Sequence, residues 1–382
     1  MDFESLFDIP IDDLHTPCYL TDARLLQKNT ALLKQIQQRT GCKILLAQKA
    51  FSMFSAYPLI RDDLAGTTAS GLFEAKLGRE HFGKEVHVFS PAYTQEDFTQ
   101  LLELCDHIVF NSFGQWKKYR QQVQDATRNI SCGIRINPGY AEVETDLYNP
   151  CISGSRMGVP LEQMEDDFAG LDGIHFHTLC EQDADALAVT LDAVEEKFGD
   201  LLPGLKWLNF GGGHHITRPD YDVERLVRCI ERVRDTYGVQ VYLEPGEAVA
   251  LNAGYLVATV LDVVHNGMDI AILDASAACH MPDVLEMPYR PHILYSGTAG
   301  EKAYTYRLAG NTCLAGDVIG DYSFDHQLQA GEKLVFCDMA IYSMVKNNTF
   351  NGVPLPDIAL YQNGHIDLVK RFGYADFEGR LS

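Results

Sequence analysis

The sequence predicts an α/β protein in which a (β/α)8 barrel is followed by a β-rich domain. Eight short runs of strand character recur over the first two thirds of the chain. Most of them are followed by a segment of helical period, and this alternation is typical of a parallel sheet. After about residue 250, strand-like runs separated by Gly, Pro and Asn continue with few helices.

The eight runs are short and have strand character, as expected for the buried strands of a parallel sheet. They cover residues 44–47, 66–69, 86–90, 107–111, 132–137, 173–177, 207–210 and 240–243. The expected helices cover residues 22–38, 72–82, 95–105, 114–123, 184–197 and 223–237. Eight such units in about 200 residues favour a closed barrel over the alternative, an open doubly wound sheet.

The β-rich domain is expected over residues 251–382. Its predicted strands cover residues 255–264, 269–275, 304–307 and 333–337, with a similar tail at 360–372. Residues 1–20 contain an extended run at 16–20 and are expected to join this domain. The barrel would then span residues 21–250.

The composition points to an enzyme-like globular chain with a small-molecule partner. The 382 residues include 31 Lys and Arg against 53 Asp and Glu, a net charge of −22. Nucleic acids and anionic membranes need a basic surface, so we expect neither as a partner. A cationic small molecule suits this charge, although the acidic residues could serve solubility alone.

Cysteine usage and the start of the chain lead us to expect a cytoplasmic protein. The ten cysteines include no CxxC pair, which favours free thiols in a reducing compartment. The first residues lack the basic and apolar regions of a signal peptide. The longest weakly polar stretch, residues 248–264, contains Asn252, Gly254 and Asp262, and it predicts a strand instead of a membrane span.

Chemically unusual residues follow several predicted barrel strands, where the active sites of such barrels lie. Lys49 follows the first apolar run. Loss of hydration there would lower the pKa of the ammonium group and suit the amine to a Schiff base. The structural alternative is a lysine that reaches solvent from a strand end. Gly211, Gly212 and Gly213 suit a phosphate or form only a tight turn.

Histidines and a glutamate lie at the ends of the last three predicted strands. His175, His177, His214 and His215 could form a metal site. No HExxH pattern accompanies them, so we expect no bound metal and a histidine that stacks on a flat ring. Glu244 would need a cationic partner if buried, either a protonated pyridine nitrogen or a structural arginine.

Together these residues form an ordered set that resembles the fold-type III family of pyridoxal-phosphate enzymes. This family includes alanine racemase and the ornithine and diaminopimelate decarboxylases. The family pattern is a strand-end lysine, a histidine, a triple glycine and Glu-Pro-Gly on successive strands, and then a cysteine loop and a tyrosine. In this chain the set comprises Lys49, His177, Gly211, Gly212, Gly213, Glu244, Cys313 and Tyr342.

The resemblance implies a role for each member of the set. Lys49 would carry pyridoxal 5'-phosphate, and His177 would stack on its ring. The triple glycine would hold the phosphate with help from Tyr342, and Glu244 would pair with the ring nitrogen. A carboxylate partner keeps that nitrogen protonated, whereas the racemase branch has an arginine there. The resemblance therefore favours decarboxylation.

Two departures from the simpler amino-acid decarboxylases narrow the resemblance. Glu247 stands where they have an arginine after Glu-Pro-Gly, and residues 178–181 replace their Gly-Ser continuation. With the run from Asp274 to Glu286, these features resemble the branch that acts on the carboxylated polyamines carboxynorspermidine and carboxyspermidine. Asp274 and Glu286 themselves could equally lie in a solvated turn or a structural pair. The expected substrate contacts are Glu247, Asp283, His280 and Asp317.

The implied reaction removes CO2 from a cationic polyamine, with Lys49 and Cys313 as catalytic residues. Cys313 would return a proton to Cα. Because this cysteine comes from the other subunit in related decarboxylases, we expect a homodimer with shared sites. Two alternatives remain: decarboxylation of diaminopimelate, ornithine or arginine, and a non-enzymatic protein that carries pyridoxal phosphate.

Overall fold

The structure is a computed structural model that describes every residue except 1–3, 5–6 and 144. It divides into two compact units, residues 27–249 and residues 1–26 together with 250–382. The expected boundaries fall after residues 20 and 250, and the observed ones fall after residues 26 and 249. No helix among the described residues is long and apolar enough to cross a membrane.

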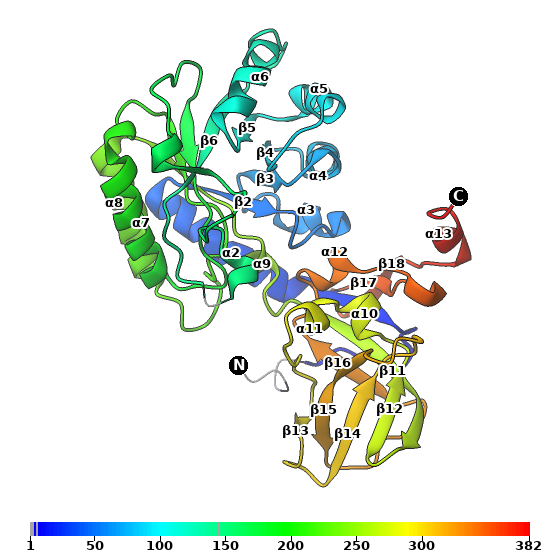
Figure 1. Ribbon diagram of the computed structural model, residues 1–382. Helices are drawn as coiled ribbons and strands as arrows, with labels where there is room; N and C mark the ends of the chain where they lie inside the picture. Colours follow the sequence, from blue (N-terminus) through cyan, green and yellow to red (C-terminus); the bar gives the residue numbers. More distant parts are fainter. Residues whose placement is uncertain (1–3, 5–6, 144) are drawn as a thin grey trace. The chain divides into compact units, whose positions relative to one another are not determined.

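Residues 27–249 contain a closed barrel of eight parallel strands (Figure 1). The order is β5-β4-β3-β2-β10-β9-β8-β6, and pairing of β5 with β6 closes the ring. The predicted barrel is confirmed, and each strand lies within two residues of its predicted run. The strands are β2 (Lys43–Ala47), β3 (Gly66–Ala69), β4 (Glu85–Phe89), β5 (His107–Phe110), β6 (Ser131–Asn137), β8 (Gly173–His175), β9 (Trp207–Asn209) and β10 (Gln240–Leu243).

Helices follow most of these strands, and several begin at a side-chain cap. Thr94, Ser112 and Asp222 each accept a hydrogen bond from the backbone amide three residues later, which satisfies one of the free donors of a helix start. The helices of this part are α2 (Ala23–Thr40), α3 (Tyr57–Ile60), α4 (Leu72–Leu77), α5 (Gln95–Leu104), α6 (Phe113–Gln124), α7 (Ala184–Phe198), α8 (Val223–Tyr237) and α9 (Glu247–Ala250).

The helix prediction needs one correction. The predicted helix at 72–82 is α-helical only to Leu77 and continues as a π-turn over Gly78–Phe82. Gly78 packs against the side chains of Thr67 and Gln48, where a Cβ atom would collide, so the wider turn accommodates this close approach.

Among its described residues, the connection from β6 to β8 has no long helix. It holds the two-residue strand β7 (Val159–Pro160), which extends the sheet from β6, and isolated one-turn segments. Glycines and prolines recur along this connection, which disfavours a continuous helix.

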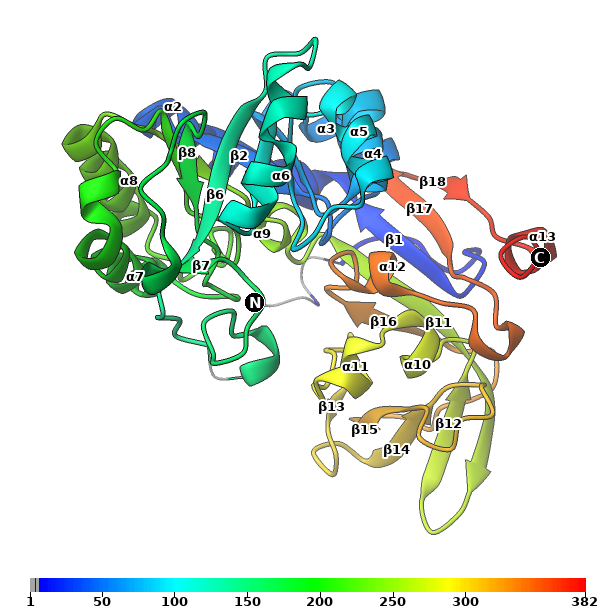
Figure 2. The ribbon, with the colours of Figure 1, turned by 45° about the horizontal axis from the view of Figure 1, so that its top comes forward.

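The second unit is built on a mixed sheet of nine strands (Figure 2). The N-terminal strand β1 (Cys18–Asp22) lies inside it, antiparallel to β11 and parallel to β17. All five residues of β1 are buried, which explains why residues near the N-terminus belong with the C-terminal part. The other strands are β11 (Gly254–His265), β12 (Asp269–Leu273), β13 (Gly297–Thr298), β14 (Tyr304–Ala309), β15 (Val318–Phe324), β16 (Lys333–Cys337), β17 (Asp357–Gln362) and β18 (His365–Lys370).

Short helices complete this unit and were absent from the prediction. Each spans about one turn, too short to show a helical period in the sequence. They are α10 (Ala277–His280), α11 (Asp283–Glu286), α12 (Ser343–Lys346) and α13 (Tyr374–Glu378).

Candidate active site

A cavity lies where the barrel strands end, and it gathers most of the barrel residues that the sequence singled out. Lys49, His177, Gly212 and Glu244 line it together. They come from the ends of four different strands, as expected when parallel strands close into a barrel. The remaining lining residues are Ala47, Thr68, Ala69, Ser70, Phe89, Arg135 and His175.

Lys49 is the one lysine of the cavity lining. It lies in a turn just after β2, where the Gln48 amide donates to the Thr68 carbonyl at 3.1 Å. The Lys49 side chain is exposed, and it lines the cavity. Burial, and next the positive charge of Arg135, lower the pKa of Lys49. The amine is therefore easier to deprotonate than that of an ordinary lysine, as a nucleophile requires.

The glycine turn after β9 needs glycine at each position. Gly211 and Gly213 have φ values of +70° and +83°, a region that favours glycine. A Cβ atom on Gly212 would lie 2.6 Å from the carbonyl oxygen of Glu244. Gly211 and Gly212 already donate their amides to Asn209 and His177. The amide of Gly213 makes no hydrogen bond within the described residues, so it is available to a phosphate.

His177 presents a neutral imidazole to the cavity. Burial lowers its pKa well below the ordinary value, and the charges of Lys49 and Arg135 lower it further. The amide of Gly212 donates to Nδ1 of His177 at 2.7 Å, so any ring proton sits on Nε2. A neutral, fixed and flat ring suits stacking on another flat ring.

Glu244 is an ionised carboxylate held by two side chains. His175 Nε2 lies 3.2 Å from Oε2 of Glu244, and the amide of Asn209 donates to Oε1 at 2.8 Å. Burial by itself would raise the pKa of Glu244, but its interaction with His175 and the hydrogen bond from Asn209 hold it below its ordinary value. The structural arginine considered as an alternative partner is not bonded to Glu244 among the described residues.

Arg135 and Asn209 are among the residues that the sequence analysis did not assign to this site. Arg135 is 4% exposed, donates to the carbonyl of His177 at 3.0 Å, and lies over the ring of Phe89. Asn209 holds Glu244 and the Gly211 amide. The available signal was a charged or polar residue inside an apolar strand, such as Arg135 in the run 132–137.

The four histidines considered for a metal site are not gathered at one point. His175 and His177 line the cavity, but His214 and His215 do not. Both ring nitrogens of His214 and of His215 are buried without a hydrogen-bond partner in the described part of the chain. Burial lowers the pKa of each ring to about 4, so both imidazoles are neutral at physiological pH.

Elsewhere in the barrel, Glu85, His87 and His107 bring possible ligand atoms within 4.8 Å of one another. The rings of His87 and His107 are stacked, 3.9 Å apart and inclined by 7°. Lone pairs in parallel ring planes do not converge on one ion. The ammonium of Lys43 already pairs with Glu85. This group is a self-contained polar cluster of the barrel interior.

Glu247 begins α9 directly after the Glu-Pro-Gly segment and is half-buried. Its charge is one of the causes that raise the pKa of Cys180. A glutamate at position 247, where the simpler decarboxylases have an arginine, therefore adds negative charge to the barrel unit. This charge lies close to Cys180, one of the residues 178–181 that replace the Gly-Ser continuation.

The remaining predicted residues lie in the sheet unit. Cys313 is exposed in the loop after β14, and its amide donates to Asn351 at 2.7 Å. Asp317 is buried and accepts from Ser276 and Thr312 at 2.8 and 2.7 Å. Asp317 thereby fastens the Cys313 loop to α10. Tyr342 precedes α12 with a φ of +56°, an uncommon backbone conformation for this residue type.

His280 ends α10 and Asp283 begins α11, and the two residues differ in exposure. His280 is fully buried, and its two ring nitrogens bond the Ser276 amide and the Pro354 carbonyl, each at 3.1 Å. Asp283 pairs with Lys346, which also bonds Glu286 at 3.0 Å. Asp274 accepts from the Thr259 amide at 2.7 Å and from Thr16 at 2.6 Å. Asp274 and Glu286 thus each have a structural partner.

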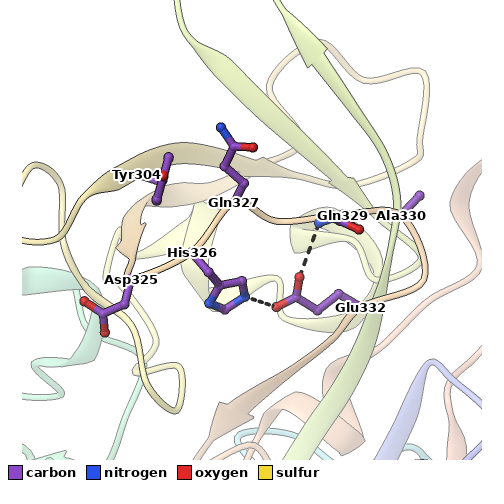
Figure 3. Close-up of a pocket in the computed structure, with 7 residues that line it drawn as sticks. All are labelled: Tyr304, Asp325, His326, Gln327, Gln329, Ala330 and Glu332. Atoms are coloured by element: carbon purple, nitrogen blue, oxygen red, sulfur yellow. Dashed lines mark hydrogen bonds and ion pairs between the residues drawn. The ribbon is translucent and has the colours of Figure 1, made fainter.

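A second hollow, of about 560 Å³, lies in the sheet unit beside the turn between β15 and β16 (Figure 3). Its polar groups bond one another: His326 pairs with Glu332 at 2.5 Å, and Glu332 accepts from the Gln329 amide at 3.2 Å. None of the predicted site residues lines it.

The strand-end cavity fits pyridoxal phosphate group by group. Lys49 offers an amine for its aldehyde, His177 a flat ring, Glu244 an ionised partner for the ring nitrogen, and the glycine turn a place for the phosphate. A (β/α)8 barrel with this site, joined to a sheet domain, defines the pyridoxal-phosphate-dependent decarboxylases of fold-type III.

The comparisons with known proteins agree with this class. The family model described as "Pyridoxal-dependent decarboxylase, C-terminal sheet domain" matches residues 18–340. The chain belongs to this family, and it is a pyridoxal-dependent carboxy-lyase.

Several relatives are similar over nearly the whole chain. A carboxynorspermidine/carboxyspermidine decarboxylase of Campylobacter jejuni is 42% identical, over 97% of this chain and 99% of the relative. A carboxyaminopropylagmatine decarboxylase of Synechocystis is 43% identical, over 97% and 96%. The crystal structure of the C. jejuni carboxynorspermidine decarboxylase with norspermidine matches with a TM-score of 0.90 at 41% identity, covering 96% of this chain and 100% of that chain.

Proposed function

We propose that this protein decarboxylates a carboxylated polyamine, carboxynorspermidine or carboxyspermidine, to norspermidine or spermidine. The observation that carries the proposal is the full-length similarity to carboxynorspermidine/carboxyspermidine decarboxylases, at 36% and 42% identity. The diaminopimelate decarboxylases that also match are only 22% to 23% identical over most of the chain. The net charge of −22 suits a substrate with several ammonium groups.

Within the barrel, Lys49, His177 and Glu244 would each have a separate role toward the cofactor. Lys49 would hold the cofactor at its carbonyl carbon through the free amine. His177 would cover the ring, and Glu244 would keep a proton on the ring nitrogen. Pyridoxal phosphate, when bound, supplies the electron sink that accepts the electrons left behind as the Cα–carboxylate bond breaks and CO2 departs. Gly211, Gly212 and Gly213 position the phosphate, and Tyr342 assists them.

The sheet unit would complete the chemistry and contact the substrate. Cys313, through its thiol, returns one proton to Cα after CO2 has left. Asp283 of the sheet unit would bind a substrate ammonium group through charge-assisted hydrogen bonds, and Glu247 of the barrel unit would do the same. The buried His280 and Asp317 are the other proposed substrate residues, and Asp317 also fixes the loop that carries Cys313.

We also propose that the protein is a cytoplasmic homodimer. The exposed position of Cys313 supports this arrangement, because an exposed thiol can serve a site on another subunit. Light scattering of the purified protein would measure the mass. One chain has a mass of 42.7 kDa, so a fully active species of that mass would contradict the proposed dimer.

A second substrate has an observation in its favour. The Synechocystis relative acts, by its name, on carboxyaminopropylagmatine, which carries a guanidinium group at the end where the polyamines carry an amine. Acidic side chains bind both ammonium and guanidinium groups, but a planar guanidinium favours a bidentate pair of hydrogen bonds to one carboxylate.

The experiment is a substrate panel. CO2 release would be measured with carboxynorspermidine, carboxyspermidine, carboxyaminopropylagmatine, diaminopimelate, ornithine and arginine. We expect the highest kcat/KM for one of the two carboxylated polyamines. A higher value for carboxyaminopropylagmatine would move the assignment to that substrate, and a higher value for a simple amino acid would refute it.

A further inference from the structure

Three adjacent barrel strands present one hydrogen-bonded chain of side chains. His175 of β8, Asn209 of β9 and Glu244 of β10 are joined through the two oxygens of the carboxylate, at 3.2 and 2.8 Å. β9 lies between β8 and β10 in the sheet. Each carboxylate oxygen thus has a separate side-chain partner, which fixes the plane in which Glu244 meets a ligand.

The surroundings of His175 select one tautomer. Oε2 of an ionised Glu244 can only accept, so Nε2 of His175 must carry the proton. Nδ1 of His175 is buried and has no hydrogen-bond partner among the described residues. A proton on Nδ1 would be a buried donor without an acceptor, which costs free energy. His175 is 2% exposed, and burial lowers its pKa. The ring is therefore neutral with Nε2 protonated.

The ring of His175 is also held in place by stacking. The ring of Phe89 lies parallel to it within 15°, with centroids 5.6 Å apart. The guanidinium of Arg135 lies 4.6 Å from the centroid of the same phenylalanine. Such stacked contacts fix ring orientation beyond simple burial.

We propose that His175 is a positioning residue for the cofactor: as a neutral Nε2–H tautomer it keeps Glu244 ionised and aimed, so that Glu244 holds the proton on the ring nitrogen of pyridoxal phosphate. The competing role for His175 is packing alone. The proposal concerns the cofactor and is independent of which amino acid or polyamine is the substrate.

Two variants separate positioning from packing. His175→Phe keeps an aromatic ring against Phe89 but removes the donor. His175→Gln keeps an amide donor of similar reach. The matched control is His107→Gln, since His107 is another neutral imidazole of the barrel interior with no hydrogen bond to Glu244 in the described structure.

The measurement is the nitrogen-15 chemical shift of ring-labelled pyridoxal phosphate in each holoenzyme, together with kcat and KM. We expect a protonated-ring shift in wild type, His175→Gln and His107→Gln. In His175→Phe we expect a shift toward the unprotonated value, with kcat about tenfold to a hundredfold lower at similar KM. A wild-type shift and kcat in His175→Phe would overturn the proposal.

The wild-type protein supplies a test if His175→Phe does not fold. The ring of His175 in nitrogen-15-labelled protein, assigned by its absence in His175→Gln, should show a neutral imidazole with the proton on Nε2. A proton on Nδ1, or a doubly protonated ring at neutral pH, would overturn the proposal.

Discussion

The backbone amide of Gly212 donates a 2.7 Å hydrogen bond to Nδ1 of His177, and so joins the glycine turn after β9 to the ring after β8. A Cβ atom at Gly212 would also lie 3.2 Å from Cε1 of the same histidine. The glycine turn and the His177 ring are therefore one unit, and a change at the turn will move the ring.

Gly212→Ala should weaken binding of pyridoxal phosphate by about tenfold or more, because the added methyl collides with the Glu244 carbonyl 2.6 Å away. Fluorescence titration of the cofactor would measure the dissociation constant. Gly373→Ala is the control, since nothing lies within 4 Å of its added Cβ. Equal affinity in Gly212→Ala and wild type would show that the turn does not support the site.

Cys313→Ala should slow turnover while cofactor binding stays unchanged, because the proposed proton donor is lost. The product mixture and kcat would be measured with a carboxylated polyamine. Cys313 is the one exposed cysteine among those described, so iodoacetamide should label it first in the native protein. Unchanged kcat and product in Cys313→Ala would remove it from the mechanism.

Asp283→Asn should raise KM for a polyamine substrate about tenfold and change kcat little, since it removes a charge that binds ground state and transition state alike. Glu286→Gln is the matched control, because both carboxylates share Lys346 but only Asp283 is proposed to touch substrate. A KM increase of the same size in both variants would point to general charge instead of a specific contact.

Stability should fall as the pH is lowered from about 6.5 to about 4, in part through His214. Burial lowers the pKa of His214 to about 4 in the folded state, whereas an exposed histidine has a pKa of about 6.5. Between these values the unfolded chain binds a proton that the folded chain does not, so acid favours unfolding.

His214→Phe should remove that contribution. We expect the dependence of the unfolding free energy on pH to become shallower by up to about 1.4 kcal/mol per pH unit in this window. Urea denaturation at several pH values would measure it. The same pH dependence in variant and wild type would mean that His214 is not held neutral.

The eight barrel strands could be predicted because each is a short run of strand character between turns or helical segments, and Lys49, His177, Gly212 and Glu244 stand at strand ends. β15 was missed because Gly320 and Asp321 interrupt it. The partners of Glu244 could not be predicted, since a sequence does not show which side chains of neighbouring strands meet. His175 was considered only as a possible metal ligand, and the polar Asn209 inside an apolar run did not by itself indicate a bond to Glu244.

The loop that carries Cys313 could also be predicted only in part, because its residues can be read from the sequence but their contacts cannot. Cys313 and Asp317 could be picked out as a cysteine and an acid four residues apart, but the partners of Asp317 could not. Ser276 and Thr312 reach it from different segments, and such contacts appear only when the chain is folded.

The most direct test of this account is an absorption scan of the purified protein with added pyridoxal phosphate, before and after borohydride, followed by mapping of the labelled peptide. The account predicts a visible band that borohydride removes, with the label on Lys49. Label on another lysine, or no reducible band, would contradict the assignment of the strand-end cavity as the cofactor site.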